Sequence, residues 1–416
     1  MSGDQDSAWW LRCTACGDTL AWQPLVRGCP ACRAEPVAAV LEAVYAPAAE
    51  PAALEDRVGR GLARYRDLLP GLADPNWTTL GEGGTPLLLS RRIGPRLGLV
   101  RLYFKLEGAN PTGSCKDRYV AASVNQARRF GYRRLAVAST GNLGLSVAAY
   151  GAAAGLATLL IAVEDTPAAV LARAQLHGAT VLAATPEDRN ALLEIAAARP
   201  GCFPIGLFLR RPVQNPFGVE GYKSLAYELI EGLGDAPAAV LFPCARGHVL
   251  FGTWKGFVEA LRWGWAERVP QMVGCQPVGA NSLELSLAAE AVEALELPPI
   301  ESLAASAAAP VASDQALLAI RQSAGAAFAA SEDEIRDAVL ALGREGLAVE
   351  PSAALPVACL PKLIEAELVD RSAPIVCVLT ARRADAPDRV PVAATAPEVL
   401  PADPARVRAF LDRHGF

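Results

Sequence analysis

The sequence has no long apolar run, no excess of basic residues and few charged residues overall. Its most apolar stretch, residues 156–163, has the length of a strand and falls far short of the roughly 18 residues of a membrane-spanning helix. The net charge of −5 provides no basic face of the kind that nucleic acids require. With 20% charged and 52% hydrophobic residues, the composition is typical of a compact globular protein. We therefore expect neither nucleic-acid nor membrane partners.

The amino terminus lacks the basic start of a secretory signal peptide, because residues 1–6 are polar and acidic. Of ten cysteines, six are scattered through apolar contexts such as Val376-Cys377-Val378. Isolated cysteines of this kind behave as small hydrophobic side chains in a reducing compartment. We therefore expect a cytoplasmic protein.

The other four cysteines form two Cys-x-x-Cys pairs separated by twelve residues: Cys13, Cys16, Cys29 and Cys32. Four thiolates at this spacing can surround one zinc ion tetrahedrally. A redox function would not need the second pair, and chance pairing is the remaining alternative. Because protein would fill all four positions, we predict a structural zinc ribbon within residues 1–46.

From Thr85 onward, short apolar runs alternate with helix-length amphipathic stretches. We predict strands at 134–138, 157–163, 180–183, 238–242, 271–276 and 375–379, with helices at 143–154, 167–176 and 249–263. This alternation predicts an α/β fold of two lobes with parallel sheets, in which ligands bind at the carboxyl ends of strands. We further expect a helical linker within 47–84 (the helix over about 48–69), a catalytic body over 85–380, and a tail, 381–416, that runs over the surface and ends in a helix at 404–414.

Two segments carry candidate chemistry. Asn110-Pro-Thr-Gly-Ser-Cys-Lys-Asp-Arg118 forms a turn that leads into a helix with Lys116 at its start. The positive end of the helix dipole favours the neutral amine, which attacks aldehydes; a solvated lysine in an exposed turn is the alternative. Ser139-Thr-Gly-Asn142 offers hydroxyls and free N–H groups at a helix N-terminus, which suit a carboxylate but also an ordinary N-cap.

Taken in order, these segments and four others resemble the threonine synthases, a branch of the fold-type-II pyridoxal-5′-phosphate (PLP) enzymes. The resemblance covers roughly residues 80–380. The other segments are Gly81-Glu-Gly-Gly-Thr-Pro-Leu87, Asn215-Pro-Phe-Gly-Val-Glu-Gly-Tyr-Lys-Ser224, Gly252-Thr-Trp-Lys-Gly-Phe257 and Val349-Glu-Pro-Ser-Ala-Ala354, with the match ending at Val378-Leu-Thr380.

The resemblance implies two open parallel-sheet lobes, the smaller one (about 120–225) inserted in the larger, and a homodimer. It implies that Lys116 forms the Schiff base with PLP and moves the α-proton. Asn142 would bind the phenolic oxygen of the cofactor, and Thr380 its pyridine nitrogen. The loop that grips the substrate carboxylate would be Ser139, Thr140, Gly141 and Asn142. A neutral partner for the pyridine nitrogen favours elimination or replacement at Cβ or Cγ over transamination.

The chain departs from the family at both phosphate sites. The glycine-rich turn that usually holds the PLP phosphate keeps one glycine, Gly247, so fewer backbone N–H groups can converge on an anion. Arg246 and His248 offer replacement donors; alternatively, the chain has lost PLP. The groups that usually hold the phosphate of O-phosphohomoserine are replaced by Pro212-Val213 and Gly218.

Each lost charge-assisted hydrogen bond costs about 1.5–3 kcal/mol, which disfavours a phosphorylated substrate, although Arg210 and Arg211 offer replacement charges just upstream. The stretch after Thr380 is also rebuilt, and Cys115 replaces the usual phenylalanine beside Lys116. We interpret Cys115 as a packing residue; a thiol that traps the aldehyde is the alternative.

The sequence therefore predicts a PLP-dependent lyase that performs β- or γ-elimination or replacement on a small amino-acid substrate. The first alternative is a genuine threonine synthase, in which Arg210, Arg211 and Arg246 hold the substrate phosphate. The second is a homologue that has lost PLP and acts as a non-PLP catalyst or a binding protein.

Overall fold

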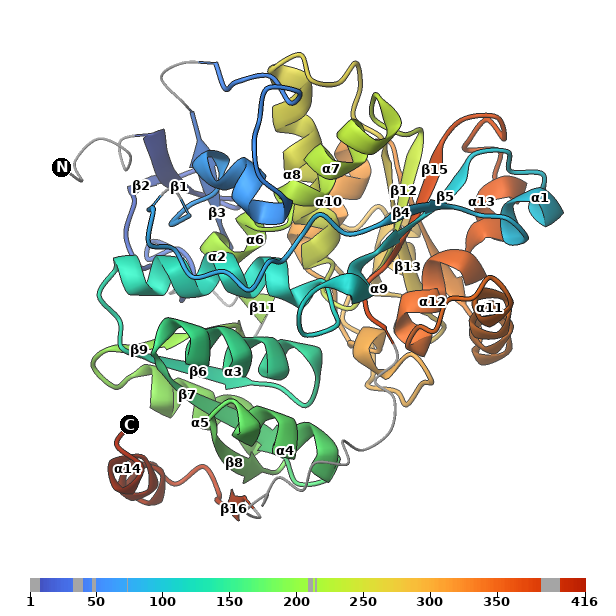
Figure 1. Ribbon diagram of the computed structural model, residues 1–416. Coiled ribbons are helices and arrows are strands. Elements are labelled where there is room, and N and C mark those ends of the chain that lie inside the picture. The colour runs from blue at the N-terminus through green and yellow to red at the C-terminus, as the bar shows by residue number, and fades with distance from the viewer. Residues whose placement is uncertain are drawn as a thin grey trace.

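The computed structural model describes residues 8–32, 40–46, 50–72, 74–208, 212–213, 215–382 and 397–416. Two separate, mainly parallel sheets form the body of the chain, and the predicted α/β class is confirmed (Figure 1). Helix α2 (Lys116–Arg129) lies between them and packs against both α3 (Asn142–Ala154) and α6 (Pro216–Glu220). None of the described helices has the length and hydropathy needed to span a bilayer.

The larger sheet has six strands in the order β14-β13-β12-β15-β5-β4, and only β4 is antiparallel to its neighbour. Its strands are β4 (Leu87–Leu89), β5 (Leu102–Leu106), β12 (Ala239–Pro243), β13 (Gln271–Pro277), β14 (Ala326–Ala330) and β15 (Ile375–Leu379). The helices associated with it are α1 (Ile93–Leu97), α7 (Lys223–Leu233), α8 (His248–Arg262), α9 (Ser282–Ala288), α10 (Asp314–Gln322), α11 (Glu332–Arg344), α12 (Pro351–Ala358) and α13 (Leu360–Glu365).

The smaller sheet has five parallel strands in the order β16-β8-β7-β6-β9. They are β6 (Arg134–Ala138), β7 (Ala157–Val163), β8 (Thr180–Ala184), β9 (Cys202–Pro204) and β16 (Glu398–Val399). Helix α3 and α4 (Ala168–Leu176) lie towards one face, and α5 (Asp188–Ala197) and α14 (Pro404–Arg413) pack on the other. A separate pair, β10 (Leu207–Phe208) and β11 (Pro212–Val213), is antiparallel.

Burial explains why the central strands could be recognised from the sequence. All five residues of β12 and of β15 are buried. Side chains of β15 alternate between two apolar clusters, with Val376 in one and Cys377 in the other. A parallel strand with helices on both faces must be apolar at every position, which produces the uninterrupted runs seen in the sequence.

The amino-terminal part forms a three-stranded antiparallel sheet of β1 (Trp9–Cys13), β2 (Thr19–Ala21) and β3 (Leu41–Tyr45). The helix expected over about 48–69 is wrong. The described part of this segment consists of turns followed by a 3-10 helix, η2 (Gly61–Leu68). Gly59 and Gly61 have φ angles of 102° and 56°, which cannot belong to a continuous right-handed helix.

The carboxyl-terminal tail is more than a surface segment. Strand β16 pairs with β8, and α14 buries Val407, Phe410 and Leu411 against the smaller sheet. This i, i+3, i+4 spacing of apolar residues is typical of a helix with one buried face. The expected helix is therefore present and is part of the apolar core next to the smaller sheet.

Candidate active site

One cavity of about 270 Å³ collects the predicted cofactor- and substrate-binding residues that the structure describes. They come from segments far apart in the sequence: Lys116, Ser139, Thr140, Gly141, Asn142, Arg246, Gly247, His248 and Thr380. The strand β6 leads to the 139–142 loop, β12 leads to the 243–248 turn, and β15 leads to Thr380. The cavity therefore lies where strands of both sheets end, as expected for parallel sheets. Arg210 and Arg211 lie outside the described residues.

Backbone pairing holds Lys116 beside Thr380. The Cys115 N–H donates to the Thr380 carbonyl at 2.8 Å, and Ser114 forms an antiparallel bridge with Ala381. Lys116 is the first residue of α2, so its side chain leaves the helix at the positive end of the dipole. Burial raises the pKa of the Cys115 thiol to about 11, which keeps it protonated at neutral pH and favours the packing interpretation.

A network of buried ion pairs, outside the cavity, holds the first turn of α2 in place. Arg118 is fully buried and pairs with Glu107 at 2.7 Å and with Glu228 of α7 at 2.6 Å. Lys105 on β5 pairs with the same Glu228 at 2.7 Å. Burial alone raises the pKa of Glu228, but Arg118 and Lys105 outweigh burial and lower that pKa to about 2. Glu107 and Arg118 belong to the family-like motif, yet they position Lys116 and do not line the cavity.

The 139–142 loop is shaped by its own hydrogen bonds. The Ser139 hydroxyl accepts from the N–H groups of Gly141 at 3.2 Å and Gly144 at 3.0 Å, so it braces the turn before α3. Thr140 is exposed at the cavity. Asn142 begins α3, and its Nδ2 donates to Glu350 Oε2 at 3.1 Å.

The turn that leads into α8 is anchored on the segment that immediately precedes α10. Arg246 Nη1 donates to the Val311 carbonyl at 2.8 Å, and the Arg246 carbonyl accepts from Ser313 N at 3.0 Å. Gly247 has a φ of 78°, and a Cβ there would clash with Ala316, so only glycine suits this position. His248 Nε2 is buried and has no hydrogen-bond partner among the described residues. Burial is the main reason that the pKa of His248 lies well below its usual value, and the nearby charges of Lys116 and Arg246 lower it further. Its imidazole is therefore neutral.

Among the cavity residues that were not predicted from the sequence are Ser306, Glu350 and Ser352. Glu350 Oε1 accepts from Ser306 Oγ at 2.9 Å, in addition to its bond from Asn142. Glu350 and Ser352 belong to the family-like segment 349–354, so the motif was visible although its contact with Asn142 was not. Ser306 lies in an alanine-rich stretch that carries no recognisable signal.

The four amino-terminal cysteines lie together, with all their sulfur atoms within 4.8 Å of one another. The Sγ atoms of Cys13 and Cys32 are 3.9 Å apart, and those of Cys16 and Cys29 are 3.8 Å apart. These separations are too long for disulfides and match the roughly 3.8 Å between thiolates that surround one zinc ion tetrahedrally. All ten cysteines of the chain are free thiols.

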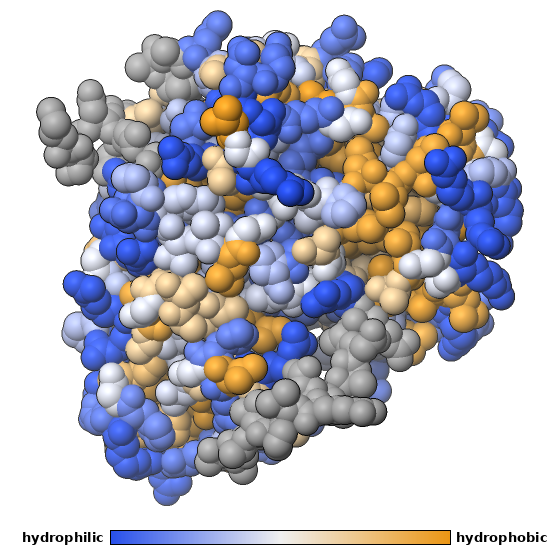
Figure 2. Space-filling model, viewed as in Figure 1, coloured by the Kyte–Doolittle hydropathy of each residue, from blue (hydrophilic) through white to orange (hydrophobic). Residues whose placement is uncertain are grey.

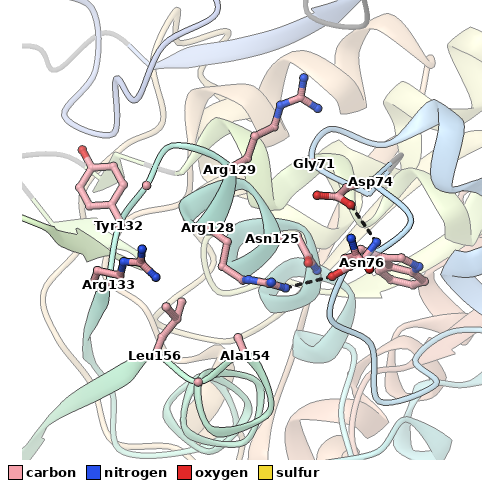
Figure 3. A pocket seen from close by; sticks show the side chains of 13 residues that line it. Gly71, Asp74, Asn76, Asn125, Arg128, Arg129, Tyr132, Arg133, Ala154 and Leu156 are labelled. Carbon is pink, nitrogen blue, oxygen red and sulfur yellow. Dashed lines mark hydrogen bonds between the residues drawn. The ribbon is translucent and has the colours of Figure 1, made fainter. Parts of the chain in front are cut away.

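A second cavity, of about 260 Å³, lies near the opposite end of α2 and contains three arginines and one aspartate (Figure 3). Arg128 donates to the Asn76 carbonyl at 3.1 Å and to Thr78 Oγ1 at 2.8 Å. Asn125 exchanges two hydrogen bonds with the backbone of Thr78. These contacts fasten the segment before β4 to α2, and the cavity lies far along the helix from Lys116.

Comparison with known proteins identifies the family of this chain. The family described as pyridoxal-phosphate dependent enzyme matches residues 78–381. The chain belongs to this family. The threonine synthase of Mycobacterium bovis is 35% identical over 350 residues, which cover 83% of this chain and 94% of that protein. The threonine synthase of Methanocaldococcus jannaschii is 32% identical over 390 residues, 91% and 93% of the two chains.

The fold agrees with this membership. The structure of the processed form of threonine deaminase isoform 2 from Solanum lycopersicum has a TM-score of 0.63 at 22% identity, covering 72% of this chain and 84% of that chain. The predicted fold-type-II architecture and the resemblance to threonine synthases are thus confirmed, as is the expectation of a PLP-dependent enzyme of the lyase class.

Proposed function

We propose that Lys116 holds PLP and that the enzyme performs elimination or replacement at Cβ or Cγ of an amino acid without a phosphate group. The observation that carries this proposal is the meeting of Lys116, the 139–142 loop and Thr380 in one cavity. An amine, an anion-binding loop and a neutral hydroxyl are the groups that such chemistry requires. When bound, PLP supplies an electron sink for negative charge at the α-carbon.

Residues of the chain would bind the cofactor and the substrate and would transfer the proton. The Lys116 amine would hold the cofactor covalently and would move the α-proton. N–H groups at the start of α3 hold the substrate carboxylate. The hydroxyl of Thr380, which lines the cavity, would serve as a neutral partner for the pyridine nitrogen.

Arg246, Gly247 and His248 hold the cofactor phosphate in this proposal. The turn lies at the N-terminus of α8, where N–H groups and the helix dipole favour an anion. The buried His248 Nε2 has no hydrogen-bond partner among the described residues, and an acceptor such as a phosphate oxygen would satisfy it. Burial lowers the pKa of Arg246 to about 10, so its guanidinium remains charged at neutral pH. These donors compensate for the missing glycines.

The packing around Gly218 supports a substrate without phosphate. Gly218 occupies the place of the arginine expected for O-phosphohomoserine. It is buried where α6 crosses α2, and an added Cβ would clash with Ser123 Oγ and lie 2.7 Å from Tyr119 Cε2. This position therefore supplies neither a charge nor space for one.

The test is an absorbance spectrum of the purified protein with PLP, followed by substrate assays. We expect a Schiff-base band near the edge of the visible range that disappears in Lys116→Ala and persists in the neighbouring control Cys115→Ser. A wild type that stays colourless with excess PLP would reject the proposal. Release of phosphate and threonine from O-phosphohomoserine by PLP-loaded protein would instead establish a threonine synthase and reject the assigned substrate class.

We also propose a structural zinc ion on the four cysteines, a cytoplasmic location and a homodimer. The sulfur separations support the zinc ion. For the dimer, the support is an apolar surface over the edge of the larger sheet, where β4 exposes Leu88 and Leu89 (Figure 2). Exposed apolar edges of this kind are typical of interfaces. The molar mass in solution decides between monomer and dimer.

A further inference from the structure

We infer that Glu350 is a positioning residue that fixes the orientation of the Asn142 side-chain amide. Glu350 immediately precedes α12 and lines the cavity that contains Lys116. Its two carboxylate oxygens have different partners, Asn142 Nδ2 at 3.1 Å and Ser306 Oγ at 2.9 Å. The inference rests on the proposed function, since it assigns Glu350 a role in the same site.

The three residues come from separate parts of the fold. Asn142 follows β6 of the smaller sheet, whereas α12 packs against β12 and β15 of the larger sheet. Ser306 lies in the short helix η4 (Ala305–Ala307), which also contacts α12. The Glu350 carboxylate therefore connects the two lobes across the cavity.

Glu350 differs from the carboxylates that stabilise the core. Glu107, Glu220 and Glu228 are each buried in ion pairs with arginine or lysine. Glu350 is half-buried and forms no ion pair with a lysine or arginine of the described segments. Its carboxylate instead accepts hydrogen bonds from the Asn142 side-chain amide and the Ser306 hydroxyl.

An asparagine amide has nearly the same shape when its oxygen and nitrogen are exchanged, so its neighbours decide which atom points where. An ionised carboxylate only accepts hydrogen bonds and therefore selects the amide nitrogen. One N–H of Asn142 is then used by Glu350 and the second remains available as a donor. If Asn142 bonds the phenolic oxygen of PLP, Glu350 ensures that a donor and not a carbonyl oxygen serves that contact.

The critical variant is Glu350→Gln, which keeps the shape but has an amide that both donates and accepts. Asn142 can then adopt the reversed orientation. We expect the Kd of PLP to rise about tenfold, as for one lost hydrogen bond, and the pH midpoint of the Schiff-base absorbance to shift. The charge-matched control is Glu365→Gln on α13, an exposed residue far from the cavity, which should leave both quantities unchanged.

A double-mutant cycle separates an action through Asn142 from a direct effect of the Glu350 charge. In the Asn142→Ala background, Glu350→Gln should change neither the PLP affinity nor the midpoint. An equal change in both backgrounds would overturn the inference. Ser306→Ala provides a second variant if Glu350→Gln folds poorly: it should weaken PLP binding about threefold in wild type and not in Asn142→Ala.

The two proposals fail in different ways. A wild-type protein that takes up no PLP rejects the proposed function, and the role of Glu350 is rejected with it. A wild type that binds PLP through Lys116, together with a Glu350→Gln variant of unchanged affinity and spectrum, rejects only the role of Glu350.

Discussion

Single residues, including some that do not line the cavity, bear on which substrate the chain can accept. Gly218 shows this most directly, because the helices α2 and α6 approach each other through its missing side chain. Restoring a charge at residue 218 therefore requires the two helices to separate. Tyr119 and Ser123, which an added Cβ would meet, are both buried.

Gly218→Arg is expected to destabilise the protein by at least about 1–3 kcal/mol through overpacking, and to produce no phosphate release from O-phosphohomoserine. The measurements are chemical unfolding and a phosphate assay. Gly343→Arg on α11 is the matched control: a Cβ there meets nothing within 4 Å, so its stability should change by less than about 0.5 kcal/mol. Phosphate release by a stable Gly218→Arg variant would show that the packing around residue 218 does not exclude this substrate.

At the scale of elements, α2 is held by charges that never reach solvent. Glu228 should make the stability of this arrangement depend on pH, because its pKa is lowered from 4.5 to about 2 on folding. A lowered pKa stabilises the folded state at pH values above 4.5, and this contribution is lost as the pH falls towards 2.

Glu228→Gln should cost about 3–5 kcal/mol at pH 7, because Arg118 and Lys105 then lose a buried anionic partner. The difference from wild type should shrink as the pH falls below 4.5, and urea unfolding at pH 7 and pH 3.5 measures it. Glu231→Gln on the same helix loses a half-exposed ion pair with Arg64 but keeps an oxygen that accepts from the Tyr65 hydroxyl, so it should cost no more than about 1 kcal/mol. A constant penalty at both pH values would contradict the assigned pKa.

The elements differ in how far the sequence could specify them. Buried strands such as β15 were predicted to the residue, because complete burial leaves an unbroken apolar run. The conformation of the linker was not predicted correctly, because Gly59 and Gly61 adopt positive φ angles that local helix propensity does not reveal. At the site, motif spacing identified Lys116 and the 139–142 loop, whereas the contact between Asn142 and Glu350 depends on how two lobes meet. Long-range pairing of this kind has no local pattern.

At the scale of the whole molecule, the cysteine-rich ribbon is packed onto the catalytic body. Lys223, which is fully buried, lies 5.0 Å from the ring centre of Trp9 and pairs with Glu220 at 2.9 Å. Lys255 of α8 donates to the Ala43 carbonyl of β3 at 2.5 Å. The ribbon thus covers a buried ionic cluster of the larger lobe.

Removal of zinc should therefore destabilise more than the ribbon. We expect one zinc per chain by elemental analysis, and a lower Tm after chelation, with loss of PLP absorbance at a lower temperature, since α8 carries the phosphate turn. Cys16→Ser should reproduce the effect, whereas Cys202→Ser, a buried cysteine of the smaller sheet, should not change the zinc content. Zinc-free protein with an unchanged Tm would contradict the structural role.

Strand β16 has a consequence for the order in which the molecule is built. The edge of the smaller sheet at β8 is completed by residues 398–399, which a ribosome produces long after it has produced residues 180–184. Until then the apolar face that α14 covers has no partner, and the pairing is strongly non-local. The smaller lobe should consequently finish folding only after synthesis of the larger lobe is complete, so a nascent chain stalled before β16 is a natural client for chaperones.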